Sequence, residues 1–198
     1  MIKNVIFDIG NVLLDFCWKD HIARFGFQGE KADRIAQAMM LGHIWPKLDL
    51  GLESDEDILE QFVAHTPELE QEIRLVFSDL STIVREYEGS VDWIESLKAR
   101  GYHTYYLSNY GERIRREASK ELSFLSHMDG GIMSYTVHLA KPDPAIYQTL
   151  LDRYGLKAEE CVFLDDTVRN VEAAQALGIA GIVVTSQEQA KKELETLL

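Results

Sequence analysis

The chain has 198 residues, of which 46% are hydrophobic and 27% are charged, a composition typical of a globular domain in water. This length fits one large domain, or one domain that carries a smaller insertion. The net charge of −13 disfavours nucleic acid and anionic membranes as partners, because both bind basic surfaces. A phosphate ester is not disfavoured, since a small site can be locally positive.

The sequence shows no segment that would direct it to a membrane. No apolar run reaches the roughly 18 residues that span a bilayer, and there is no room for a signal peptide before Asp8. We therefore expect a cytoplasmic protein. Cys17 and Cys161 have neither the number nor the spacing of a disulfide framework or a zinc site, so we expect both to pack as small hydrophobic side chains. No long heptad pattern is present, and a monomer or a weak homodimer is expected.

The first part of the chain changes character after a single strand. Residues 2–8 form a short apolar run with β-branched side chains, which predicts a buried strand. The stretch 17–87 has no good strand candidate. Ser54 to Asp57 has the spacing of a capping box, and Pro67 occupies a first helical position. Helical patterns cover residues 19–25, 30–41, 55–63 and 67–84. This stretch therefore predicts a helical insertion.

After Gly89, helices alternate with strands. The predicted helices are 91–100, 111–122, 144–154, 168–177 and 187–198. The predicted strands are 102–107, 132–133, 137–139, 162–164 and 182–184, with the second and third placed to pair as a small hairpin. This alternation implies right-handed crossovers and a parallel sheet covered by helices on both faces. The predicted fold class is therefore α/β.

Four short polar sequences each follow an apolar run. Because the carboxyl ends of parallel strands share one edge of the sheet, these sequences would meet there. They would supply a nucleophilic carboxylate, a hydroxyl with an amide, an ammonium and a carboxylate pair: Asp8, Ser108-Asn109, Lys141 and Asp165-Asp166. Such a set is that of a magnesium-dependent phosphoryl-transfer site that works through an aspartyl-phosphate.

The adjacent acids Asp165 and Asp166 favour a metal. Two carboxylates beside Asp8 would repel each other strongly unless a cation lay between them. Mg²⁺ suits an all-oxygen site with one or two direct carboxylates. A helix N-terminus that carries acids explains one of the two residues well and the pair poorly.

The four sequences resemble the motifs of the haloacid dehalogenase-like hydrolase superfamily, subfamily IA, in order and spacing over nearly the whole chain. They are Phe7–Leu14, Leu107–Asn109, Lys141–Tyr147 and Phe163–Asp166. The resemblance implies a Rossmann-like three-layer αβα core formed by residues 1–15 and 88–198. It also implies that residues 16–87 form a small all-α cap domain after the first strand.

The resemblance implies roles for the acidic residues. The expected activity is that of a Mg²⁺-dependent phosphatase acting on a small phosphorylated metabolite, for which a sugar phosphate is one candidate. Asp8 would be the nucleophile. Asp8, Asp166 and the backbone carbonyl of Gly10 would bind the metal directly, and Asp165 would act through water.

The resemblance also implies roles for the remaining motif residues. Lys141 would bind the transferring phosphoryl group and offset the carboxylates. Ser108 and Asn109 would donate to the phosphate oxygens. Asn170, one helical turn after Asp166, either steadies that acid or a bound water or lies on the helix surface.

One position departs from the pattern of most phosphatases of this superfamily. They carry a second aspartate, the general acid, two residues after the nucleophile, where this chain has Gly10. General acid catalysis is typically worth roughly 10² to 10⁴ in rate. Three readings follow: a substrate with a good leaving group, a proton from Asp15, His21 or His43, or a weak or silent phosphatase. The Gly-Asn-Val-Leu version resembles the branch of bacterial α-D-glucose-1-phosphate phosphatases and of the amino-terminal domain of mammalian epoxide hydrolases.

The insertion carries further candidates for substrate contact, namely His21, His43, Trp45 and Asp49. Two alternative functions stay open. A 2-haloacid dehalogenase also lacks the second aspartate, but it needs no metal, and the acid pair argues against it. A catalytically weak relative that binds a phosphorylated ligand would retain the site and lose turnover.

Overall fold

The computed structural model describes all 198 residues and is centred on a five-stranded sheet in the order β5-β4-β1-β6-β7. All neighbouring strands are parallel. The strands are β1 (Asn4–Phe7), β4 (His103–Ser108), β5 (Gly130–Met133), β6 (Cys161–Asp165) and β7 (Ala180–Val183). The predicted α/β class with a parallel sheet is confirmed.

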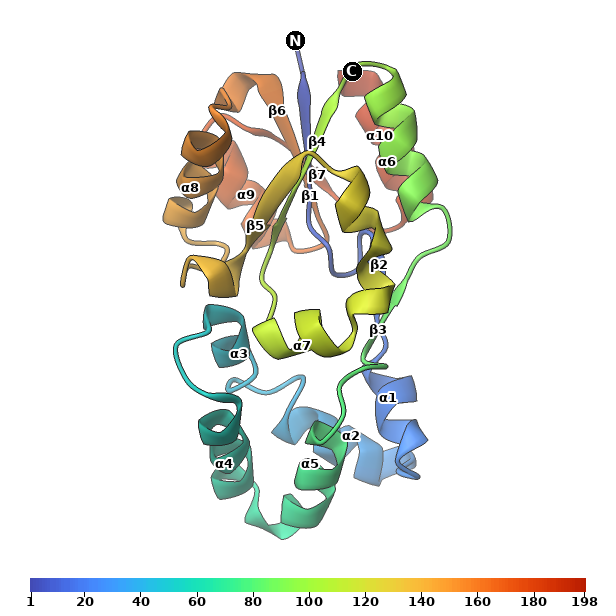
Figure 1. Ribbon diagram of the computed structural model, residues 1–198, viewed down its shortest axis with the longest axis vertical. Coiled ribbons are helices and arrows are strands. Elements are labelled where there is room, and N and C mark those ends of the chain that lie inside the picture. The colour runs from blue at the N-terminus through green and yellow to red at the C-terminus, as the bar shows by residue number, and fades with distance from the viewer.

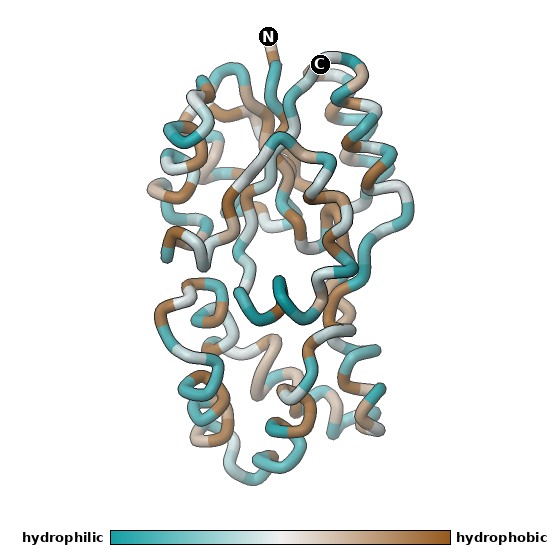
Figure 2. Tube along the Cα trace, viewed as in Figure 1, coloured by the Kyte–Doolittle hydropathy of each residue, from teal (hydrophilic) through white to brown (hydrophobic).

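Helices cover both faces of this sheet. One face is covered by α8 (Pro144–Tyr154) and α9 (Val168–Ala176), and the other by α6 (Ser90–Ala99) and α10 (Gln187–Leu197) (Figure 1). Side chains alternate along β1, so that Ile6 packs with the α8 side, and Phe7 packs with the opposite side. Because both faces are buried, β1 is apolar from Val5 to Phe7. Figure 2 shows this hydrophobic concentration on the strands.

A two-stranded antiparallel ribbon leads away from the sheet. It consists of β2 (Leu14–Phe16) and β3 (Val84–Glu86). Five helices lie between these strands in sequence and beyond the end of the sheet in space (Figure 1): α1 (Trp18–Arg24), α2 (Gly29–Ala38), α3 (Pro46–Leu50), α4 (Asp55–His65) and α5 (Glu70–Phe77). We propose that residues 16–87 form a cap domain over the core, and we refer to them as the cap segment.

Several helix ends follow local rules that the sequence displays. The Ser54 hydroxyl accepts a hydrogen bond from the backbone N–H of Asp57 at 3.1 Å, which caps α4 as the capping-box spacing predicts. Asp143 caps α8 through the N–H of Ala145, and Gly155, with φ of 63°, ends that helix.

Two strand predictions are wrong. Residues 137–139 form no strand, because a 3₁₀ turn, η3 (Ser134–Thr136), follows β5 directly and His138 adopts a left-handed φ of 56°. The predicted hairpin therefore does not form. Conversely, the stretch 17–87 does contain a strand, since β3 pairs with β2. With three residues and an exposed middle side chain, β3 has too little pattern to stand out in the sequence.

Three helix predictions are too long, and the one over 30–41 ends at Ala38 as α2. The helix predicted over 67–84 is divided into η1 (Pro67–Leu69) and α5, and it ends at Phe77. Asp79 then accepts a hydrogen bond from the N–H of Ser81 at 2.9 Å, which stabilises a turn instead of a further helical turn. The helix predicted over 111–122 is α7 (Glu112–Glu117) followed by η2 (Ser119–His127). A further 3₁₀ turn, η4 (Ala158–Glu160), precedes β6.

The sheet order determines where a ligand can bind. The chain passes from β1 to β4 and β5 on one side, and β6 and β7 lie on the other side of β1. In open α/β sheets, the crevice at such a change of direction, beyond the carboxyl ends of the strands, is the usual binding site. No helix of the protein has both the length and the apolar character needed to cross a membrane.

Candidate active site

Three carboxylates lie together at the carboxyl ends of β1 and β6. One oxygen each from Asp8, Asp165 and Asp166 fall within 4.8 Å of one another. The backbone N–H of Asp8 donates to the Leu164 carbonyl at 2.8 Å, so the contact between β1 and β6 continues up to this residue. Asp8 and Asp165 are buried, and Asp166 is half-buried.

Lys141 brings a buried ammonium to these acids. Its Nζ lies 2.9 Å from Asp8 Oδ1 and 2.6 Å from Asp165 Oδ2. The residue comes from the loop before α8 and not from a strand end, and a cis peptide joins it to Pro142. The sequence therefore places Lys141 correctly, although the strand expected to lead to it is absent.

Asn109 holds the backbone of Lys141. Its Nδ2 donates to the Lys141 carbonyl at 3.0 Å, and its Oδ1 accepts from the Lys141 N–H at 2.7 Å. Since both the nitrogen and the oxygen of the Asn109 side chain bond to the backbone of Lys141, Asn109 positions the lysine. Nδ2 keeps a second N–H and Asn109 lines the cavity described below, so donation from this residue to a phosphate oxygen stays a prediction. Ser108 is buried at the end of β4, and its hydroxyl lowers the pKa of Asp8.

Asp165 is fully buried, and protein donors occupy both of its oxygens. Besides Lys141, they are the N–H of Thr167, at 2.7 Å from Oδ1, and Asn170 Nδ2, at 3.1 Å from each oxygen. Asn170 therefore steadies Asp165. Of the alternatives for Asn170, neither the contact with Asp166 nor a place on the helix surface is found, because the first turn of α9 directs this buried amide back toward the end of β6.

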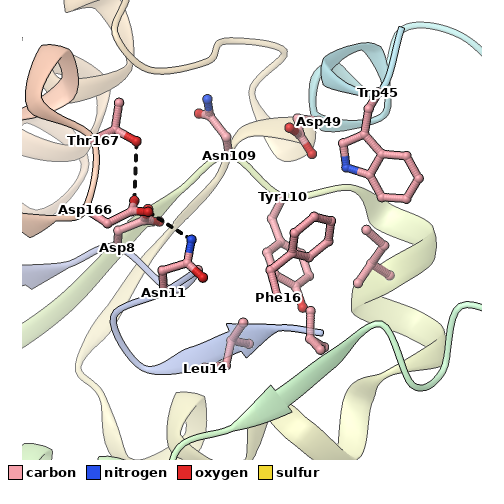
Figure 3. A pocket seen from close by; sticks show the side chains of 13 residues that line it. Asp8, Asn11, Leu14, Phe16, Trp45, Asp49, Asn109, Tyr110, Asp166 and Thr167 are labelled. Atoms are coloured by element: carbon pink, nitrogen blue, oxygen red, sulfur yellow. Dashed lines mark hydrogen bonds between the residues drawn. The ribbon is translucent and has the colours of Figure 1, made fainter. Parts of the chain in front are cut away.

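Asp166 is held by a residue that the sequence analysis did not single out. Asn11 Nδ2 donates to Asp166 Oδ2 at 2.9 Å, and the Thr167 hydroxyl lies 3.3 Å from the other oxygen (Figure 3). Asn11 has a φ of 55°, a left-handed conformation that asparagine tolerates better than most residues. A polar residue with this property, in the turn after the first strand, is the signal that could have identified it.

Burial and charge shift the pKa values of this cluster. Burial raises the pKa of Asp8 to about 7, and the Asp165 charge raises it too, while Lys141 and Ser108 lower it. Burial lowers the pKa of Lys141, but the attraction of Asp8 and Asp165 outweighs burial and raises it overall. When all three carboxylates are ionised, the cluster with its one ammonium carries two excess negative charges. The oxygen donors and this excess charge fit a hard divalent cation.

A cavity of about 240 Å³ opens between this cluster and the cap segment. Asp8, Asp166 and Asn109 line one side. Trp45 and Asp49 of the cap segment lie on the other side (Figure 3). The remaining wall is largely apolar and is formed by Leu14, Phe16, Val84, Tyr110 and Ile114. A polar cluster that faces an apolar wall is typical of a site for a small organic ligand.

The other cap candidates do not reach this cavity. His21 is fully buried, with Nδ1 3.0 Å from the Thr82 hydroxyl and Nε2 3.3 Å from the Val76 carbonyl. His43 stacks edge to face with His65 at 4.8 Å between ring centroids. Asp15 accepts a hydrogen bond from the Cys17 thiol at 3.2 Å. None of these three candidates lines the cavity.

The chain belongs to the haloacid dehalogenase-like hydrolase family, whose model matches residues 2–178. It is 30% identical over 142 residues to the phosphorylated carbohydrates phosphatase of Thermotoga maritima, a match that covers 71% of this chain and 63% of that protein. It is 29% identical over 207 residues to mouse acyl-CoA dehydrogenase family member 10, of which it spans only 19%. A 2-haloacid dehalogenase of a Pseudomonas species also matches.

The fold is shared with solved members of this family. A HAD family enzyme of Bacteroides thetaiotaomicron, solved with magnesium and inorganic phosphate, superposes with a TM-score of 0.72. The two proteins are 22% identical, and the match covers 94% of this chain and 96% of the other. This similarity confirms the Rossmann-like architecture expected from the sequence.

Proposed function

We propose that this hydrolase is a Mg²⁺-dependent phosphatase that cleaves a small phosphate monoester through an aspartyl-phosphate at Asp8. The observation that carries the proposal is the contact of a buried ammonium with the Asp8 carboxylate, at 2.9 Å, beside two further carboxylates. An isolated buried acid would be expected to stay neutral. Lys141 together with a divalent cation would keep Asp8 ionised and nucleophilic.

Each residue of the cluster then has a physical role. Asp8 attacks phosphorus, and Lys141 neutralises the charge on the equatorial phosphoryl oxygens. Asp165, fully buried and hydrogen-bonded on both oxygens, orients Lys141. Asp8, Asp166 and the Gly10 carbonyl would hold Mg²⁺, which when bound offsets the phosphoryl charge.

The cavity supports a small substrate. A volume of about 240 Å³ is smaller than the usual pocket for a drug-sized ligand and suits a phosphoryl group with a modest alcohol. The aromatic side chains of Trp45 and Phe16 would pack against an apolar face of that alcohol, as they would against a sugar ring. A sugar phosphate is therefore the first substrate class to test, and the name of the Thermotoga relative points to the same class.

The test is hydrolysis of a panel of phosphorylated sugars and simple alkyl phosphates, with Mg²⁺ and with EDTA. The native protein is compared with Asp8→Asn, which keeps the shape of the carboxylate but is a poor nucleophile. Turnover that requires both Mg²⁺ and Asp8 supports the proposal. If 2-chloropropionate were hydrolysed without metal and no phosphate ester were cleaved, the dehalogenase reading would replace it. Tight binding of phosphate with no turnover would favour a ligand-binding relative.

A further inference from the structure

Cleavage of a phosphate monoester leaves an alkoxide, which departs readily only when a proton reaches it. Four titratable side chains line the cavity: Asp8, Asp166, Tyr110 and Asp49. Asp8 and Asp166 belong to the carboxylate cluster. Burial raises the pKa of Tyr110 well above its ordinary value, so this phenol is a poorer acid than a tyrosine in water. Asp49 is the remaining acid that faces the cavity.

The turn after Asp8 does not supply this proton. Gly10 has no side chain, and Asn11 carries an amide. A Cβ added at Gly10 would meet no atom within 4 Å, so a lack of space does not explain the glycine. An acid that serves the leaving group must therefore come from another part of the chain.

Contacts between the cap segment and the core fix Asp49 in place. The Ser134 hydroxyl of η3 donates to the Asp49 carbonyl, and His138 Nδ1 lies 2.8 Å from the Leu50 carbonyl. Gly51 ends α3 with a φ of 60°, and a Cβ at this position would lie 3.0 Å from Tyr135 Cβ. These contacts attach α3 to the core, so the position of Asp49 relative to Asp8 is set by hydrogen bonds and close packing.

The surroundings of Asp49 suit a group that exchanges protons. The side chain lies across the cavity from Asp8 and Asp166, next to Trp45 (Figure 3). Burial raises the pKa of Asp49 to about 7, and the charge of Asp8 raises it too, while Lys141 lowers it. A carboxyl group with a pKa near 7 can both give and accept a proton at neutral pH.

We propose that Asp49 of the cap segment is the proton donor and acceptor of the phosphatase reaction, an inference that rests on the proposed function. When the Asp8 oxygen bonds to phosphorus and the ester P–O bond breaks, the Asp49 carboxyl protonates the leaving oxygen, which departs as a neutral alcohol. The Asp49 carboxylate then takes a proton from the water that attacks phosphorus. The bond from phosphorus to Asp8 breaks, and phosphate is released.

The test compares Asp49→Asn with the native protein on two substrates in the presence of Mg²⁺. An alkyl phosphate requires protonation of its leaving oxygen, whereas 4-nitrophenyl phosphate releases a stable anion. We expect kcat/KM to fall about 10²- to 10⁴-fold for the alkyl phosphate and less than about tenfold for the aryl phosphate. Asp33→Asn, an exposed substitution elsewhere in the cap segment, is the matched control and should change neither value.

A second readout separates chemistry from a structural role. Loss of the base slows hydrolysis of the phosphoenzyme, so Asp49→Asn should release a burst of one nitrophenolate per protein before a slow steady state. Asp49→Glu, which retains an acid, should recover part of the alkyl phosphatase activity. Equal losses on both substrates without a burst would overturn the role of Asp49. If the native protein cleaved neither ester, the proposed phosphatase function itself would fail.

Discussion

Replacing Asp8 with asparagine removes one of three clustered carboxylates and should stabilise the metal-free protein. Burial and Asp165 raise the pKa of Asp8 from 3.8 to about 7. Between these values the folded protein holds a proton that the unfolded chain has released, so the free energy of unfolding falls as the pH rises from about 4 to 7. At 1.36 kcal/mol per pH unit, the difference corresponds to roughly 4 kcal/mol above pH 7.

The assay is thermal denaturation in EDTA at pH 8 and pH 5. At pH 8 we expect the free energy of unfolding of Asp8→Asn to exceed that of the native protein by about 2–4 kcal/mol, which raises Tm by roughly 5–15 °C. At pH 5 the gain should shrink to below about 2 kcal/mol, because Asp8 is protonated in the folded native protein. Mg²⁺ should stabilise the native protein more than the variant. The reasoning is refuted if the variant is less stable than the native protein at pH 8, or if its gain does not change with pH.

Three further predictions concern stability and are checked by denaturation. Asn170→Ala leaves both Asp165 oxygens short of a donor and should cost about 1.5–3 kcal/mol; an unchanged midpoint in urea would contradict this. Burial lowers the pKa of His21, so the unfolded chain takes up a proton at a higher pH than the folded protein. The free energy of unfolding should therefore fall as the pH drops below about 6.5, by at most about 1.4 kcal/mol per pH unit. His21→Gln should reduce this slope, and an equal slope in the variant would contradict the role of His21. Gly131→Ala places a Cβ against the Tyr106 ring and carbonyl and should cost about 1–3 kcal/mol; a neutral effect would show that β4 and β5 can separate.

The residues that could be predicted from sequence are those fixed by local pattern. Asp8 and Asp165 follow short apolar runs that form β1 and β6, so their position at one sheet edge follows from the parallel topology. The metal and nucleophile roles of these acids stay predictions. The contact between Lys141 and both acids was anticipated from its motif, even though no strand precedes it.

The parts that could not be predicted depend on how distant segments pack. The sequence names Asp49 as one of four candidates for substrate contact but does not separate it from His21 and His43, because its place at the cavity depends on the contact of α3 with η3, between residues 85 positions apart. The role of Asn109 is hidden for the same reason, since its amide pairs with a backbone 32 residues away. The strand β3 could not be predicted because its three residues are too few to show a period-two pattern.

The most direct measurement is mass spectrometry of the protein quenched in acid during turnover of a phosphate ester with Mg²⁺. We predict a phosphoryl group on the peptide that contains Asp8. It should be absent in Asp8→Asn and should accumulate in Asp49→Asn. Turnover of the ester with no phosphoryl adduct on this peptide, or with an adduct on another residue, would contradict nucleophilic attack by Asp8.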